Sequence, residues 1–261
     1  APEVADLLAA ASAEPLAGWR AANLHEMTRR HAHATALSST LVDALARAAA
    51  KSETAWRAAR AESSYAAVRG PFGEVLRLTR EAAAAKAEAL GLDPYAALLD
   101  QYEPGGSVAR IESLFAELEA ALPRVLEAVL ERQARAGDPE MPAGPFQVPA
   151  QRGLARDIMT TLGFDFTHGR LDETLHPFCG GVPEDVRVTT RFSESGFVSG
   201  VMGVIHETGH AMYERGLPAG WRGLPVGEAR GMVLHESQSL LMEMQACRSP
   251  AFLAHLSGMA K

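Results

Sequence analysis

Cysteine is scarce in this sequence, whose 261 residues include only Cys179 and Cys247. Two cysteines are too few for the disulfide framework of a small secreted protein, and neither has the spacing of a metal knuckle. We therefore expect two reduced thiols in a cytoplasmic protein. The first 15 residues contain no basic region, and Asp6 and Glu14 interrupt their apolar run, so we do not expect a secretory signal there.

Excess positive charge is also missing, because the formal net charge is -7. Nothing therefore attracts the protein as a whole to nucleic acid or to anionic membranes. No apolar run approaches the length of a membrane span. Aromatic residues make up only 6% of the chain, whereas alanine is abundant, which favours closely packed helices. The composition is typical of a globular protein of one or two domains.

The first half of the chain has the pattern of successive helices. Apolar residues between Ser107 and Leu122 recur at helical spacing, and Ser107 is suited to cap that helix. The same reasoning predicts helices at 38–50, 52–69 and 72–90, with Gly70-Pro71 separating the last two and Gly91 ending the third. Pro123 predicts a kink or a new helix start. We assign residues 1–136 to a helical N-terminal region.

The second region, residues 137–261, has a different sequence pattern, with loop and strand signals between its helices. It opens with a loop, because residues 137–149 contain four prolines and two glycines. A helix is expected around 150–162, followed by two or three short strands within 164–178 and 185–192, which are rich in β-branched and aromatic residues. Two further helices are predicted, at 200–215 and 228–246. The fold class is therefore mainly α with a small β-sheet, and the two regions are expected to form one compact unit.

The segment His206-Glu207-Thr208-Gly209-His210 is the strongest chemical signal. Residues four apart share one helix face, so the two imidazoles can converge on one metal ion. Glu207 projects about 100° away around the axis, where it can act as general base on a water activated by the ion. Thr208 and Gly209 leave room for a close neighbour. The alternative is a buried helix whose histidines only bond to backbone.

A catalytic zinc ion needs a third protein ligand, and the next helix supplies His235-Glu236-Ser237-Gln238. Either Glu236 or His235 can serve, because the apolar residues of this helix do not determine its rotation. His235, Gln238 and Glu228 are candidates for groups that orient the ligands. The alternative is an ordinary polar patch on an exposed helix face. With this motif, residues 137–261 become the expected catalytic region.

Four motifs, in this order, resemble the thermostable carboxypeptidase Taq family of metallocarboxypeptidases. They are His176-Pro177-Phe178, Asp185-Val186-Arg187-Val188-Thr189, the HExxH segment at 206–210, and His235-Glu236-Ser237-Gln238. The resemblance implies a multi-helix, zincin-like fold with a long groove. It also implies one zinc or cobalt ion per chain on His206, His210 and Glu236, with Glu207 as the base. The substrate implied is a peptide with a free C-terminus, and the assembly implied is a homodimer.

The family pattern includes further segments before and after these motifs, so we expect this chain to be the central portion of such a protein. Arg187 and Thr189 alternate along a predicted strand and share one face. Arg187 is a candidate contact for a substrate carboxylate or carbonyl, and the alternative is an ion pair with Asp185 or Glu184. His176 is expected in a turn near the site, in a structural or a catalytic role. The rival functions are a zinc endopeptidase or aminopeptidase with the same ligands, or an inactive metal-binding helical fragment.

Overall fold

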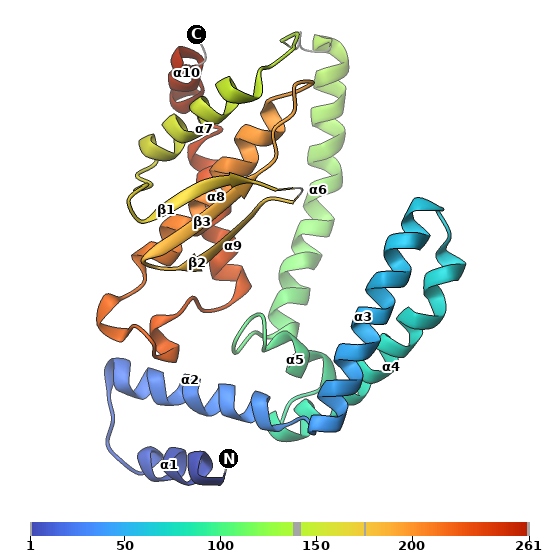
Figure 1. The fold of residues 1–261 in the computed structure, drawn as a ribbon, viewed down its shortest axis with the longest axis vertical. Coiled ribbons are helices and arrows are strands. Elements are labelled where there is room, and N and C mark those ends of the chain that lie inside the picture. Colours follow the sequence, from blue (N-terminus) through green and yellow to red (C-terminus); the bar gives the residue numbers. More distant parts are fainter. Residues whose placement is uncertain (1, 138–141, 175, 260–261) are drawn as a thin grey trace. The chain divides into compact units, whose positions relative to one another are not determined.

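The computed structural model describes residues 2–137, 142–174 and 176–259, and they are mainly helical (Figure 1). The chain divides into two compact units. One is Ala1–Val108 with Leu224–Val226, and the other is Ala109–Gly223 with Gly227–Lys261. Among the described helices, none is both long and apolar enough to span a lipid bilayer.

The first unit contains five helices among its described residues: α1 (Pro2–Ser12), α2 (Gly18–Thr35), α3 (Ser39–Ala61), α4 (Tyr65–Leu90) and α5 (Pro94–Leu99). The predicted caps are confirmed at two ends. The Ser38 hydroxyl accepts the N–H of Leu41 at 3.2 Å, and α4 ends at Gly91, whose φ of 67° suits glycine. The core of the unit lies between α3 and α4, where Leu41 packs with Leu78.

The predicted helix break at Gly70-Pro71 is wrong. The chain instead turns at residues 62–64, between α3 and α4, and α4 continues through Pro71. Proline in a helix removes one backbone hydrogen bond. The buried contacts of Leu78 and Ala82 with α3, on the C-terminal side of Pro71, stabilise the helix despite this loss. Residues 39–50 and 52–61, predicted as parts of two helices, belong to the single helix α3.

Helix α6 (Val108–Ala136) is continuous and contains Pro123, so the prediction of a new helix start there is wrong. Its apolar residues do fall on one face, as the spacing predicts. Within the part of the chain that the structure describes, however, α6 has no buried residue, and Phe115 is 64% exposed. The helix is therefore amphipathic without a covering partner among the described residues.

The second unit places a small sheet beside α8 (Val198–Gly216), preceded by α7 (Val148–Thr161). The sheet contains β1 (Gly169–Glu173), β2 (Phe178–Val182) and β3 (Asp185–Thr190), in the order β1-β3-β2. β1 and β3 lie within the predicted ranges, whereas β2 begins where the first range ends and extends beyond it. β1 runs parallel to β3, and β2 runs antiparallel to it. Val186 and Val188 of β3 are buried against Val204 and Ala211 of α8. This contact anchors one side of α8 on the sheet.

The other side of α8 is covered by α9 (Met232–Leu240) and the π-helical turn that continues it (Leu241–Ala246), with α10 (Pro250–Met259) after them. The predicted helix at 228–246 starts later than expected, because Gly231 with φ 75° precedes Met232. Two short 3₁₀ turns, Ala219–Trp221 and Pro225–Gly227, lie between α8 and α9.

Candidate metal centre

The HExxH segment lies in the middle of α8 with nearly all of its side chains buried. Glu207, Thr208 and His210 are buried, and His206 is half-buried. Gly209 makes the closest approach to the neighbouring helix, because a Cβ there would lie 2.6 Å from the Cα of Ser239. The room expected at this glycine is therefore filled by the backbone of α9, which brings the side chains of α9 to the two histidines.

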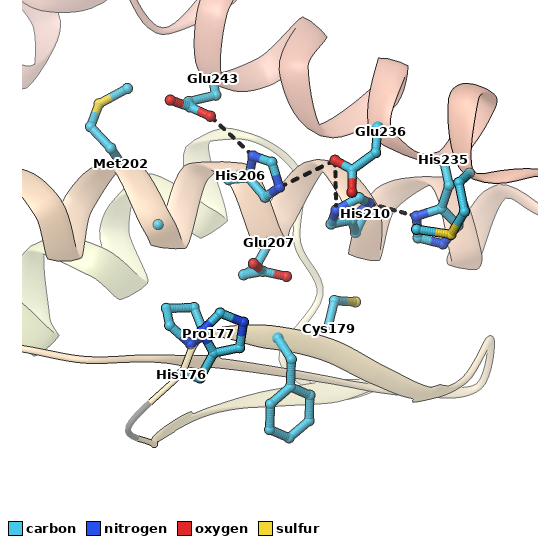
Figure 2. Close-up of a pocket in the computed structure, with 13 residues that line it drawn as sticks. His176, Pro177, Cys179, Met202, His206, Glu207, His210, His235, Glu236 and Glu243 are labelled. Carbon is cyan, nitrogen blue, oxygen red and sulfur yellow. Dashed lines mark hydrogen bonds and ion pairs between the residues drawn. The ribbon is translucent and has the colours of Figure 1, made fainter. Parts of the chain in front are cut away.

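Three side chains meet at this helix contact (Figure 2). The Oε2 atom of Glu236 lies 3.5 Å from Nε2 of His206 and 3.5 Å from Nε2 of His210. One ligand atom from each of these residues lies within 4.8 Å of the others. A zinc ion bonded at about 2.0–2.1 Å to tetrahedral nitrogen and oxygen ligands separates them by about 3.4 Å. The donor set and its spacing therefore fit a divalent metal ion.

His206 is held from its other ring nitrogen. Its Nδ1 lies 3.0 Å from Oε2 of Glu243, in the π-helical turn. The second oxygen of Glu243 accepts a bond from Arg248 at 2.9 Å. The carboxylate therefore fixes the imidazole so that its Nε2 faces Glu236.

His210 is held by a different arrangement. Its Nδ1 lies 2.6 Å from Nδ1 of His235, and Nε2 of His235 lies 2.8 Å from Oε1 of Glu214. Both ring nitrogens of His235 thus have partners, His210 at Nδ1 and Glu214 at Nε2. Of the two candidates for the third ligand, the structure brings Glu236 to the Nε2 atoms of His206 and His210. His235 lies on the opposite edge of the His210 ring, at Nδ1.

Glu207 points from α8 toward the sheet, away from the contact with α9 (Figure 2). Burial raises the pKa of its carboxyl, an effect that His206 opposes and Glu236 reinforces. Burial also lowers the pKa of His210, and His235 adds to that lowering. A neutral imidazole and a carboxylate with raised proton affinity are the forms that a metal ligand and a general base require.

An open cavity of about 600 Å³ lies over these residues. Its walls come from α8, from α9 with the π-helical turn, and from the start of β2 with the turn before it. His176 and Cys179 line the sheet side, across from Glu207 (Figure 2). His176 is exposed, whereas burial raises the pKa of the Cys179 thiol to about 12, with Glu207 and Glu214 adding to the rise.

The remaining predicted site residues lie elsewhere. Val186 and Val188 face α8, so Arg187 projects from the opposite face of the sheet, where it bonds to Asp185 at 2.6 Å. The hydroxyl of Thr189 is used within the sheet, since it accepts the N–H of Phe178 at 2.9 Å. Among the described residues, the Gln238 side chain bonds only to the hydroxyl of Ser237, at 3.3 Å. None of these side chains lines the cavity.

Sequence reasoning missed Glu214 and Glu243. A signal for the first was available, because Glu214 is four residues after His210 and shares its helix face. Glu243 is seven residues after Glu236, also near one face, but the π-helical turn between them changes its direction in a way that spacing does not show.

Comparison with known proteins agrees with this geometry. The sequence profile of a family described as "Carboxypeptidase Taq (M32) metallopeptidase" matches residues 1–261. Thermostable carboxypeptidase 1 of Thermus thermophilus is 38% identical over 244 residues, which are 89% of this chain and 47% of that protein. Carboxypeptidase 1 of Bacillus subtilis is 36% identical over 195 residues, covering 74% of this chain and 38% of that protein.

A solved structure is similar over almost the whole chain. The structure of Trypanosoma cruzi metallocarboxypeptidase 1 matches with a TM-score of 0.94 and 39% identity, covering 99% of this chain and 52% of that one. The chain thus spans about half the length of the relatives that it matches.

Proposed function

Because the chain belongs to the carboxypeptidase Taq (M32) family of metallopeptidases, we propose that it carries the metal centre of a metallocarboxypeptidase. Such an enzyme hydrolyses the last peptide bond of a substrate with a free C-terminus. The observation that carries the proposal is the convergence of Glu236 on the Nε2 atoms of His206 and His210, with Glu207 one residue away.

The three converging residues would hold one divalent ion, zinc in our proposal, with cobalt as the alternative that the same ligands suit. When bound, the ion lowers the pKa of water and polarises the substrate carbonyl. His206 and His210 would bind as neutral imidazoles, and Glu236 as a carboxylate. Glu207, on the side of α8 that faces the cavity, would take the proton from the attacking water and pass it to the leaving amine.

The substrate would lie in the cavity between α8 and the start of β2, where His176 faces Glu207. We propose His176 as a contact to the substrate on this side. The family resemblance further suggests a homodimer, and the two cysteines suggest a cytoplasmic enzyme. Light scattering on the full-length protein would test the dimer, since a monomer at micromolar concentration would contradict it.

The reaction is tested by giving the full-length, metal-loaded protein one peptide in two forms, with a free and with an amidated C-terminus. A carboxypeptidase releases single residues from the free form and leaves the amide intact. Equal cleavage of both forms would instead identify an endopeptidase or an aminopeptidase, and mass spectrometry of the products would separate these two.

The role of Glu207 is tested by Glu207→Gln. The variant should bind metal as the parent does but lose hydrolysis by at least about 100-fold, because the amide cannot accept the proton. Glu194→Gln, an exposed carboxylate outside the cavity, is the matched control and should keep full activity. A Glu207→Gln protein with near-normal turnover would refute the general-base role. Failure of the parent protein to bind any divalent metal would favour the inactive helical fragment.

A further inference from the structure

The two histidines of the cluster are supported unequally. Nδ1 of His206 contacts the carboxylate of Glu243 directly, whereas Nδ1 of His210 contacts a second imidazole, that of His235, which in turn contacts the carboxylate of Glu214. We propose that His235 and Glu214 form a positioning relay, which sets the tautomer and the orientation of His210. This inference rests on the proposed function, because a tautomer of His210 matters only when its Nε2 binds a metal ion.

Metal binding at Nε2 of His210 would assign the protons in the relay through these contacts. If Nε2 of His210 donates its lone pair to the ion, its ring proton must be on Nδ1. That N–H then donates to Nδ1 of His235, 2.6 Å away. His235 must therefore carry its own proton on Nε2, and this N–H donates to Oε1 of Glu214 at 2.8 Å. The carboxylate of Glu214 would then accept the last hydrogen bond and stabilise the whole chain of bonds.

The orientation of the His235 ring is also fixed by its surroundings. The Tyr213 ring meets the His235 ring edge to face, with centroids 5.2 Å apart and an interplanar angle of 88°. The Tyr213 hydroxyl in turn accepts the backbone N–H of Arg230 at 3.4 Å. His235 is therefore fixed by two hydrogen bonds and by an aromatic contact. A side chain that only joined two helices would not need its ring orientation defined in this way.

The helix pairing explains why the relay exists for one histidine only. Contacts run from His206 to Glu243, from His210 to Glu236, and from Glu214 to His235, so α8 and the α9 segment are antiparallel. Glu214 is one turn after His210, too far along α8 to reach the metal site, but it faces the start of α9. His235, next to Glu236 in sequence, fills the space between the two.

The test measures zinc affinity, by chelator competition, on the full-length protein. Removing an outer hydrogen-bond partner of a metal ligand typically weakens binding by about 10–100-fold. We expect a loss in this range for His235→Ala and about 10-fold for Glu214→Gln. His235→Gln should be within a few-fold of the parent, because its amide oxygen can accept the His210 proton. Glu184→Gln, which removes an exposed carboxylate bonded to Arg222 at 2.6 Å, should change nothing.

Two readouts separate a relay from a merely structural bond. In a relay, the double variant of His235→Ala and Glu214→Gln binds zinc no more weakly than His235→Ala alone, because Glu214 acts through His235. The visible spectrum of the cobalt-loaded protein should also shift in His235→Ala and not in Glu184→Gln. Additive losses, or unchanged zinc affinity in both single variants, would overturn the relay. A parent protein that binds no zinc would instead refute the proposed function itself.

Discussion

Gly209 lies directly against Ser239, so closely that a Cβ on the glycine would come within 2.6 Å of the Ser239 Cα. The same added carbon would lie 2.7 Å from the backbone oxygen of Gln238. These are backbone atoms, which cannot rotate away as a flexible side chain can. The contact therefore sets the distance between α8 and α9, and with it the distance from Glu236 to the two histidines.

Gly209→Ala should weaken both the fold and the metal site. Alanine is the better helix former by about 0.5–1 kcal/mol, but forcing an extra carbon into packed backbone costs about 1–3 kcal/mol. We expect a lower free energy of unfolding by about 1–2 kcal/mol and at least about 10-fold weaker zinc binding. Urea unfolding of the metal-free protein and zinc titration measure the two effects.

The matched control is Gly216→Ala, in the same helix. A Cβ there meets nothing within 4 Å, so only the helix preference changes and the unfolding free energy should stay equal or rise. If Gly209→Ala behaved like this control, the close contact would not determine the spacing of the two helices.

The same contact shows which parts of the site were predictable from sequence. His206 and His210 are paired by the helical repeat, which is a local property, and so the spacing alone predicted that they share a face. The choice between Glu236 and His235 depends on the rotation of α9. That rotation depends on how α9 packs against α8, including the close contact at Gly209, and local apolar spacing contains no information about it.

The fold, like the site, has features that local sequence predicted and features that it did not. Strands β1 and β3 and the end of α4 at Gly91 were predicted correctly, because strand composition and glycine act locally. The break expected at Pro71 was wrong, because packing of α4 on α3 outweighs one lost hydrogen bond. The composition of the π-helical turn that carries Glu243, Leu241–Ala246, does not distinguish it from an ordinary α-helical segment.

Thr189→Val tests the structural role of a residue that the sequence placed on the same strand face as Arg187. The side chain is only 4% exposed, and its hydroxyl accepts the N–H of Phe178, which begins β2 after the His176 turn. Valine has the same shape but leaves that N–H unpaired, which costs about 1–3 kcal/mol of unfolding free energy. Urea unfolding should show this loss, whereas Thr54→Val, an exposed hydroxyl bonded within α3, should cost far less. Equal losses would mean that the hydroxyl of Thr189 does not hold β2 in place.

Arg187→Ala should have little effect on stability or on metal binding. Its guanidinium is 53% exposed and bonds to Asp185 on the sheet face away from α8. Exposed pairs of this kind contribute about 0–1 kcal/mol, so we expect a change in unfolding free energy of at most about 0.5 kcal/mol. Zinc affinity should be unchanged. A rise in KM for peptides with a free C-terminus, with kcat unchanged, would support the substrate-carboxylate role predicted from sequence.

The stability of the first unit should depend on pH through Asp100. Burial opposes ionisation of this carboxyl, but bonds from the Gly105 N–H, His33 and Arg29 outweigh burial and hold its pKa below the ordinary value. The unfolded chain therefore binds the proton more readily than the folded one. The stabilisation is complete above the unfolded pKa of about 3.9 and is lost as the pH falls through the folded pKa.

Asp100→Asn isolates this contribution. At pH 7 it removes one of the two buried carboxylates that bond to Arg29, the other being Glu26, and it also removes the carboxylate partner of His33, so we expect a loss of about 1–3 kcal/mol. As the pH is lowered below about 4, the parent protein loses the same stabilisation, so the difference between the two thermal midpoints should narrow. Asp43→Asn, which removes an exposed carboxylate paired with Arg47, should give a small difference at every pH. The difference between the thermal midpoints of the parent and of Asp100→Asn could instead stay constant from pH 7 to pH 3. That result would contradict the prediction, because it would mean that Asp100 has the same pKa in the folded and the unfolded state.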